Sequence, residues 1–178
     1  MRNSILILIF LITSVVSAQD EVLAKEYYDN GEFEKALISY QRLLEQNPNN
    51  QDFFFKILDI HHQLENYDVV REMLNDKVSK SRNPQFLVEL GYNFQLSGNQ
   101  EKAKEFYNKA ILAIEENPVY TYYVANRFES HALIDYAATA YEKGMALNPK
   151  LNYNIQLARI YGEQGKVEKM FNKGSFSF

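Results

Sequence analysis

The densest group of possible metal ligands in the sequence is His61-His62-Gln63-Leu64-Glu65. His61 with Glu65, and Asp59 with His62, stand four and three residues apart, the spacing of side chains on one helix face. His61 lies 34 residues after Tyr27 and 33 residues before Phe94, and both of these are aromatic in a repeated pattern. We therefore expect His61 in the core, and the two pairs on different faces of the helix. The sequence therefore predicts no metal site, and metal binding through His61 and His62 is the weakest alternative.

Other groups that could perform catalysis are scarce. The chain has no cysteine, which excludes a disulfide scaffold, a thiol nucleophile, cysteine-ligated metal and an acylated cysteine anchor. It has no glycine-rich phosphate loop, no Gly-x-Ser-x-Gly motif and no His-Glu-x-x-His motif. Glu115 and Glu116 are adjacent and do not face a common substrate. We interpret His131 as a cap and Asp135 as a solvated helix start. Neither an enzyme nor a cofactor is expected.

The composition describes a folded and mostly helical protein. Of 178 residues, 46% are hydrophobic and 24% are charged, which excludes a disordered chain. Only 7 glycines and 4 prolines are present, as expected for helices joined by brief turns and not for an all-β fold. The net charge of −4 gives no attraction for phosphate backbones, so nucleic acid is not an expected partner.

Residues 1–18 have the layout of an export signal. Arg2 is followed by an apolar run from Ile5 to Ile12 and then by small residues that end in Ala18. The run is shorter than the roughly 20 residues that a bilayer-spanning helix needs. We therefore predict a cleaved signal peptide, export to the periplasm or surface of a bacterial cell, and no membrane span after cleavage. Retention of the segment as a membrane anchor is the alternative.

The rest of the chain repeats with a period of 33 or 34 residues. A compact column, an aromatic column three residues later, a turn column and a second small column recur in phase. These columns are Ala24, Leu58, Gly91, Ala125, Ala158; Tyr27, His61, Phe94, Phe128, Tyr161; Gly31, Glu65, Gly98, Ala132, Gly165; and Ala36, Val70, Ala103, Ala137, Met170. Each repeat is therefore predicted to be a helical hairpin, with a left-handed residue at the turn column and close helix contact at the small columns.

The hairpin pattern predicts the helices and their junctions. Every proline follows an asparagine, where the asparagine is expected to cap and the proline to open the next helix. These junctions are Asn47-Pro48, Asn83-Pro84, Asn117-Pro118 and Asn148-Pro149. The predicted helices cover residues 20–30, 33–46, 51–64, 67–80, 84–97, 100–115, 118–130, 134–147, 151–163 and 166–173.

The order of small, aromatic, glycine, alanine and proline positions resembles the tetratricopeptide repeat family. The resemblance extends from about residue 18 to residue 171 and implies an all-α, right-handed α-solenoid of stacked helix-turn-helix repeats. The implied repeats cover about 18–50, 51–83, 84–117, 118–150 and 151–178, the last being incomplete. Because the last repeat lacks a complete covering helix, we expect self-association or a longer natural array.

The resemblance also implies where a partner binds. In that family the first helix of each repeat lines a concave face, through positions three before, one after and four after the compact column. The candidate groove residues carried over are Tyr28, Phe55, Asp59, His62, Tyr92, Gln95, Tyr122, Asn126 and Arg159. Aromatic bodies interleaved with polar groups are typical of protein or peptide interfaces. We expect a non-catalytic scaffold of the bacterial cell envelope; the alternative is the repeat region of a longer protein whose C-terminal part is enzymatic or regulatory.

Overall fold

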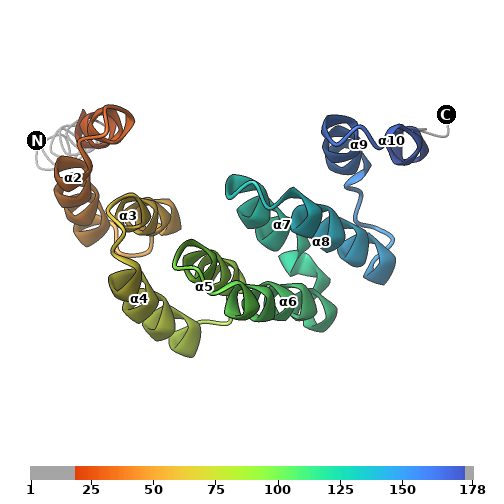
Figure 1. The fold of residues 1–178 in the computed structure, drawn as a ribbon, viewed down its shortest axis with the longest axis horizontal. Coiled ribbons are helices and arrows are strands. Elements are labelled where there is room, and N and C mark those ends of the chain that lie inside the picture. Colours follow the sequence, from red (N-terminus) through yellow and green to blue (C-terminus); the bar gives the residue numbers. More distant parts are fainter. Residues whose placement is uncertain (1–18, 175–178) are drawn as a thin grey trace, which may run out of the picture. The chain divides into compact units, whose positions relative to one another are not determined.

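The computed structural model describes residues 19–174, and every regular element in that range is helical (Figure 1). This confirms the all-α prediction. A helical segment over residues 19–29 is followed by α2 (Phe33–Gln46), α3 (Gln51–Gln63), α4 (Tyr67–Lys80), α5 (Gln85–Leu96), α6 (Gln100–Glu116), η1 (Pro118–Tyr120), α7 (Thr121–Ser130), α8 (Ile134–Leu147), α9 (Asn154–Glu163) and α10 (Val167–Gly174). The predicted signal peptide, residues 1–18, lies outside the described residues. No helix among those described is both long and apolar enough to cross a membrane.

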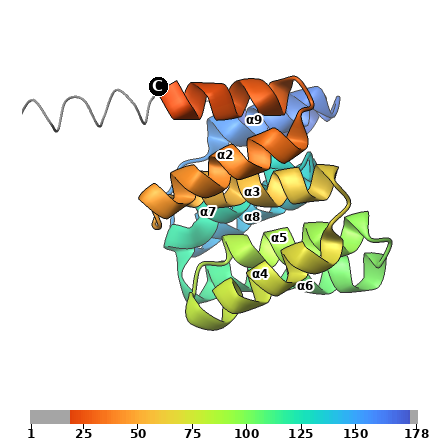
Figure 2. The same cartoon turned by 90° about the vertical axis from the view of Figure 1, so that its left-hand side faces the viewer.

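The described residues divide into two compact units, and the division along the chain falls within α4, between Val70 and Arg71. Unit 1 contains the segment 19–29, α2 and α3, and unit 2 contains α5 to α10. In unit 2, α5 packs on α6, α7 on α8 and α9 on α10, so each neighbouring pair forms a hairpin (Figures 1 and 2). Successive hairpins also stack, because α5 packs on α7 and α6 on α8. This is the stacking of a helical solenoid.

Each hairpin turn contains one residue in the left-handed region of backbone space, as the turn column predicts. The φ angles are 75° at Gly31, 85° at Gly98 and 67° at Gly165, but also 57° at Glu65 and 54° at Ala132. At Gly98 the following N–H, from Asn99, donates to the carbonyl of Phe94 at 2.8 Å, which closes the end of α5. The turn geometry is therefore kept even where the chain carries a side chain that disfavours it.

The small columns are places of close helix contact. Ala103, Ala125 and Ala137 are fully or almost fully buried between helices. A methyl group built on Gly91 would overlap the ring of Tyr107, which crosses from α6. The predicted close approach of paired helices is confirmed. In unit 2 the paired helices enclose a continuous hydrophobic core that includes Tyr107.

At two of the asparagine-proline junctions the asparagine accepts from a backbone N–H as predicted, but α5 begins at Gln85, after Pro84, and α7 begins at Thr121, after η1. The Asn83 side chain accepts from the backbone N–H of Gln85 at 3.0 Å, just before α5. The Asn117 side chain accepts from the N–H of Val119 at 3.1 Å, and Pro118 opens the short 3-10 helix η1 ahead of α7. These asparagines satisfy N–H groups that have no partner within the first turn.

The same prediction is wrong at the other two junctions. After Asn47-Pro48 the chain makes a further turn, and Asn50 caps α3 by accepting from the N–H groups of Asp52 and Phe53. The Asn148 side chain does accept from the N–H of Lys150 at 3.1 Å, but helix α9 begins at Asn154 and not at residue 151. There the side chain of Asn152, and not that of Asn148, accepts from the first N–H of the helix, that of Asn154, at 3.1 Å.

Candidate functional site

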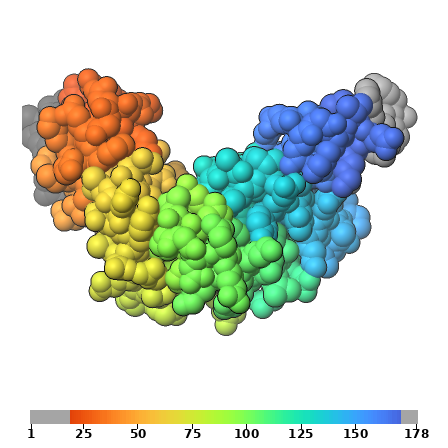
Figure 3. Space-filling view, in the orientation of Figure 1, coloured from red at the N-terminus to blue at the C-terminus, as the bar shows by residue number. Residues whose placement is uncertain are grey.

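In unit 2 the predicted groove positions lie on α5, α7 and α9, the first helices of three successive hairpins (Figure 1). Figure 3 shows one face of these hairpins, coloured from green to blue. We call the surface at the groove positions the first-helix face and define it by the predicted residues Tyr92, Gln95, Tyr122, Asn126 and Arg159 together with Glu129, four after Ala125, and Ile155, three before Ala158. Tyr122 is 48% exposed and Ile155 is 68% exposed, and the side chains of Asn126 and Arg159 are exposed as well. Tyr92 and Gln95 are half-buried. The face therefore presents apolar and amide groups to solvent.

On each of the second helices α6 and α8, a tyrosine holds one residue of this face. The Tyr107 hydroxyl donates to the Gln95 side-chain carbonyl at 3.0 Å, and one repeat later the Tyr141 hydroxyl donates to Glu129 at 2.9 Å. Burial raises the pKa of both tyrosines, so both hydroxyls keep their protons at neutral pH. The face is therefore anchored to the core at the same position in two consecutive repeats.

A buried ion pair joins α5 to α7. Glu89, fully buried in α5, accepts through Oε1 from Arg127 Nε and lies 2.7 Å from His131 Nε2. Burial alone would raise the pKa of Glu89, but the charges and hydrogen bonds of His131 and Arg127 hold it at about 2. The carboxylate is therefore ionised at neutral pH and clamps the two helices together.

The histidine of this clamp also orients a residue of the face. The ring of His131 stacks on Tyr92 with centroids 3.7 Å apart and planes 16° apart. His131 is indeed the C-cap residue of α7, as interpreted from the sequence, but its side chain serves the Glu89 clamp and Tyr92 instead of ending as a simple cap. Asp135 lies in the first turn of α8 and is exposed, as expected, and accepts from Gln164 at 3.0 Å.

A second ion pair joins α7 to α9. Arg159 on α9 pairs with Glu129 on α7 and lies 3.3 Å from Glu163 on its own helix. The hydrogen bond to Glu129 is the main reason that the pKa of Arg159 is raised. Because this guanidinium is already paired with two carboxylates, the first-helix face offers a partner hydrogen bonds and apolar contact more than net charge.

The groove positions in unit 1 are less accessible. Phe55 and His62 on α3 are buried, and Asp59 is half-buried. Tyr28 is half-buried, with the Lys56 ammonium 4.5 Å from its ring centroid. Partner contact through Phe55 and His62 stays a prediction, but these side chains present little surface.

The neighbouring His61 is buried, as predicted for its column, and burial lowers its pKa. Its Nδ1 lies 3.4 Å from the Asn66 amide nitrogen. His62 is buried as well, and metal binding through His61 and His62 stays a prediction.

The Glu89 clamp was not found from the sequence. Its members lie 38 and 42 residues apart, which no local motif connects. One signal was available: Glu89 is the only charged residue in the otherwise apolar and amide-bearing α5. A lone charge on a buried helix requires a partner, and Arg127 on the next first helix supplies it.

Comparison with known families identifies the repeats. A family described as "TPR repeat" matches residues 24–65, within unit 1, and one described as "Tetratricopeptide repeat" matches residues 84–117, which contain α5 and α6. The chain contains tetratricopeptide repeats. Each unit therefore contains a matched repeat, and the repeat columns from Ala24 to Glu65 and from Gly91 to Ala103 fall within the matched ranges. A search of curated proteins found no match.

Several solved structures resemble the chain. The MamA protein is 19% identical, with 88% of each chain covered and a TM-score of 0.44. BtubC (BKLC) from P. vanneervenii is 16% identical, with 88% of this chain and 76% of that chain covered and a TM-score of 0.47. YrrB, described as a TPR protein with an unusual peptide-binding site, is 15% identical over 84% of this chain and 78% of that chain, with a TM-score of 0.39.

Proposed function

We propose that this chain is a non-catalytic scaffold that binds a protein or peptide partner on its first-helix face. The observation that carries the proposal is that exposed apolar and amide side chains stand on helices that ion pairs hold in place. Tyr122, Asn126 and Ile155 face solvent, while the Glu89 clamp and the Arg159–Glu129 pair fix the helices that carry them. Pre-organised surfaces of this kind lose little entropy on binding.

The chemistry of the face indicates what the partner offers. Tyr122 and Ile155 supply area that a partner would desolvate, as interface anchors do. Asn126 carries both a donor and an acceptor, which suits the backbone of an extended segment or a polar side chain. Since Arg159 is paired within the chain, we expect an apolar segment with free hydrogen-bonding groups, and not a carboxylate, as the main element recognised.

Affinity purification from the native cell tests this proposal. The tagged wild-type chain and a Tyr122→Ala, Ile155→Ala double variant are compared by quantitative mass spectrometry of the proteins that co-purify. The matched control is Leu147→Ala, because Leu147 on the second helix α8 is 44% exposed, close to Tyr122 at 48%. We expect a specific set of partners that the double variant loses and the control keeps. Partners retained by the double variant would place binding elsewhere.

We further propose that the protein acts outside the cytoplasm, in the bacterial envelope. The proposal rests on the layout of residues 1–18, with Arg2, the apolar run from Ile5 to Ile12 and the small residues that end at Ala18. We expect the mature protein to begin at Gln19 and to fractionate with the envelope. The mass of the purified N-terminal peptide checks this, and a mass that includes Met1 would support the anchor alternative.

A further inference from the structure

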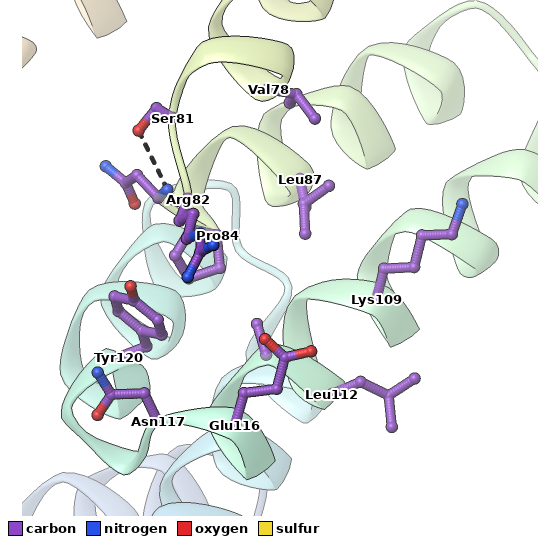
Figure 4. Close-up of a pocket in the computed structure, with 12 residues that line it drawn as sticks. Val78, Ser81, Arg82, Pro84, Leu87, Lys109, Leu112, Glu116, Asn117 and Tyr120 are labelled. Atoms are coloured by element: carbon purple, nitrogen blue, oxygen red, sulfur yellow. Dashed lines mark hydrogen bonds between the residues drawn. The ribbon is translucent and has the colours of Figure 1, made fainter.

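A cavity of about 710 Å³ lies in unit 2, between the C-terminal part of α4, the start of α5 and the second helix α6 (Figure 4). It is not part of the first-helix face. Its lining combines aliphatic side chains with charged groups at the margin: Val78, Leu87, Leu112, Arg82, Lys109 and Glu116. Its volume is in the range that binds small molecules or short peptide segments.

In the next repeat, an ion pair bridges the equivalent contact between second helices, which we call the α6–α8 joint. Lys143 on α8 corresponds to Lys109 on α6, one period of 34 residues earlier, and Glu115 corresponds to Ser81. Between α6 and α8 the two charged residues form an ion pair, Lys143 with Glu115. At the cavity, Ser81 stands at the position equivalent to Glu115, and its side chain has no carboxylate to pair with Lys109. This joint therefore lacks the acid that bridges the next one.

The local backbone explains why the position differs. Helix α6 continues through Glu116, so Glu115 lies in its last turn, whereas α4 ends at Lys80 and leaves Ser81 outside the helix. The Ser81 hydroxyl accepts from the N–H of Asn83 at 3.1 Å, the bond drawn in Figure 4. The serine thus stabilises the loop into α5 and does not reach α6.

The two cationic side chains on the cavity lining are Lys109 and Arg82. Lys109 turns back to Glu105 on its own helix at 2.6 Å, an exposed pair of the kind that contributes little and is easily exchanged. Arg82 is exposed and forms no ion pair or hydrogen bond with any residue in the range 19–174. The one acid on the lining itself is Glu116, and Lys109 already has Glu105 as its partner, so Arg82 is the lining cation that has no ion pair among the described residues.

We propose that this cavity is a second binding site, which takes an acidic peptide segment of a partner protein. An aliphatic side chain of the segment enters between Val78, Leu87 and Leu112. A neighbouring carboxylate pairs with Lys109, in the place that Glu115 takes at Lys143, and a second carboxylate pairs with Arg82. The chain's own α6–α8 joint is the example of this chemistry.

A labelled peptide that copies residues 110–117 of this chain is the probe, because that segment carries Glu115 and the aliphatic residues beside it. Binding to the purified chain from residue 19 is measured by fluorescence anisotropy at low salt. We expect saturable binding that weakens about tenfold with Lys109→Met and with Arg82→Met. Ser81→Glu, which supplies an acid from within the chain, is expected to weaken it as well.

Three controls make the result specific. Lys143→Met removes the matched lysine of the closed joint, and Asn126→Ala alters the first-helix face; neither is expected to change the affinity. A probe with both glutamates replaced by glutamine is expected to lose binding. Absence of saturable binding, equal binding of the glutamine probe, or sensitivity to Lys143→Met or Asn126→Ala in place of Lys109→Met would overturn the proposal. Circular dichroism confirms that each variant keeps its helices.

Discussion

Replacing Ala132 by glycine is expected to stabilise the protein, and replacing Gly98 by alanine to destabilise it by a similar amount. The two residues hold the same place in consecutive hairpins, with φ of 54° and 85°. A side chain in this region costs about 1–2 kcal/mol, and alanine recovers about 0.4–1 kcal/mol by restricting the unfolded chain. A Cβ on Gly98 would meet no atom within 4 Å, so contacts add nothing to the backbone cost. The net change is about 1 kcal/mol in each direction.

Urea unfolding followed by far-ultraviolet circular dichroism measures both changes. The matched control is Ala146→Gly, the same chemical change at an exposed position within the helix α8. Ala146 lies in the last turn of α8, and glycine there is expected to cost up to about 1 kcal/mol, because it loses more backbone entropy than alanine on folding. The reasoning requires Ala132→Gly and Ala146→Gly to have opposite signs. If both destabilise the protein, the left-handed turn is not the source of the effect.

Other substitutions test the core and the clamps. Glu89 has its pKa held at about 2, below the ordinary 4.5, so its ionised form stabilises the fold above pH 4.5 and that contribution is lost as the pH falls through 2. The pKa difference corresponds to about 3 kcal/mol of unfolding free energy. In Glu89→Gln, the free energy of unfolding measured in urea is therefore expected to fall less steeply as the pH is lowered. Gly91→Ala is expected to cost about 1–3 kcal/mol in thermal unfolding, because its methyl group would overlap the Tyr107 ring; an unchanged melting temperature would contradict that close contact. Tyr141→Phe removes the hydrogen bond to Glu129 and is expected to cost about 1–2 kcal/mol by the same measurement, whereas no loss would mean that this bond does not anchor the face.

The helices could be predicted closely because the repeat places its turns. Helices α2, α4 and α8 begin and end at the predicted residues, 33–46, 67–80 and 134–147. The turn column ends each first helix in a left-handed residue, and this holds even for Glu65 and Ala132, which the period alone identifies. A period in phase over several repeats is therefore stronger information than the propensity of any one residue.

Local caps and burial could not be predicted in the same way. Helix α9 begins at Asn154, where the Asn152 side chain accepts from its first N–H, whereas the asparagine-proline pattern placed the junction at Asn148. Spacing places Phe55 on the same helix face in its repeat as Tyr122 in its own, yet the structure buries the first and exposes about half of the second. Exposure depends on the side chains packed around a position, and the period carries no information about those.

Photocrosslinking in the native cell tests the binding face most directly. A photoreactive amino acid replaces Tyr122 or Ile155 on the first-helix face, and Leu147 on the second helix α8 as the matched exposed position. We expect crosslinks to one defined protein from both positions on the face and none to that protein from Leu147. Crosslinks that form equally from Leu147, or none from Tyr122 and Ile155, would contradict the account.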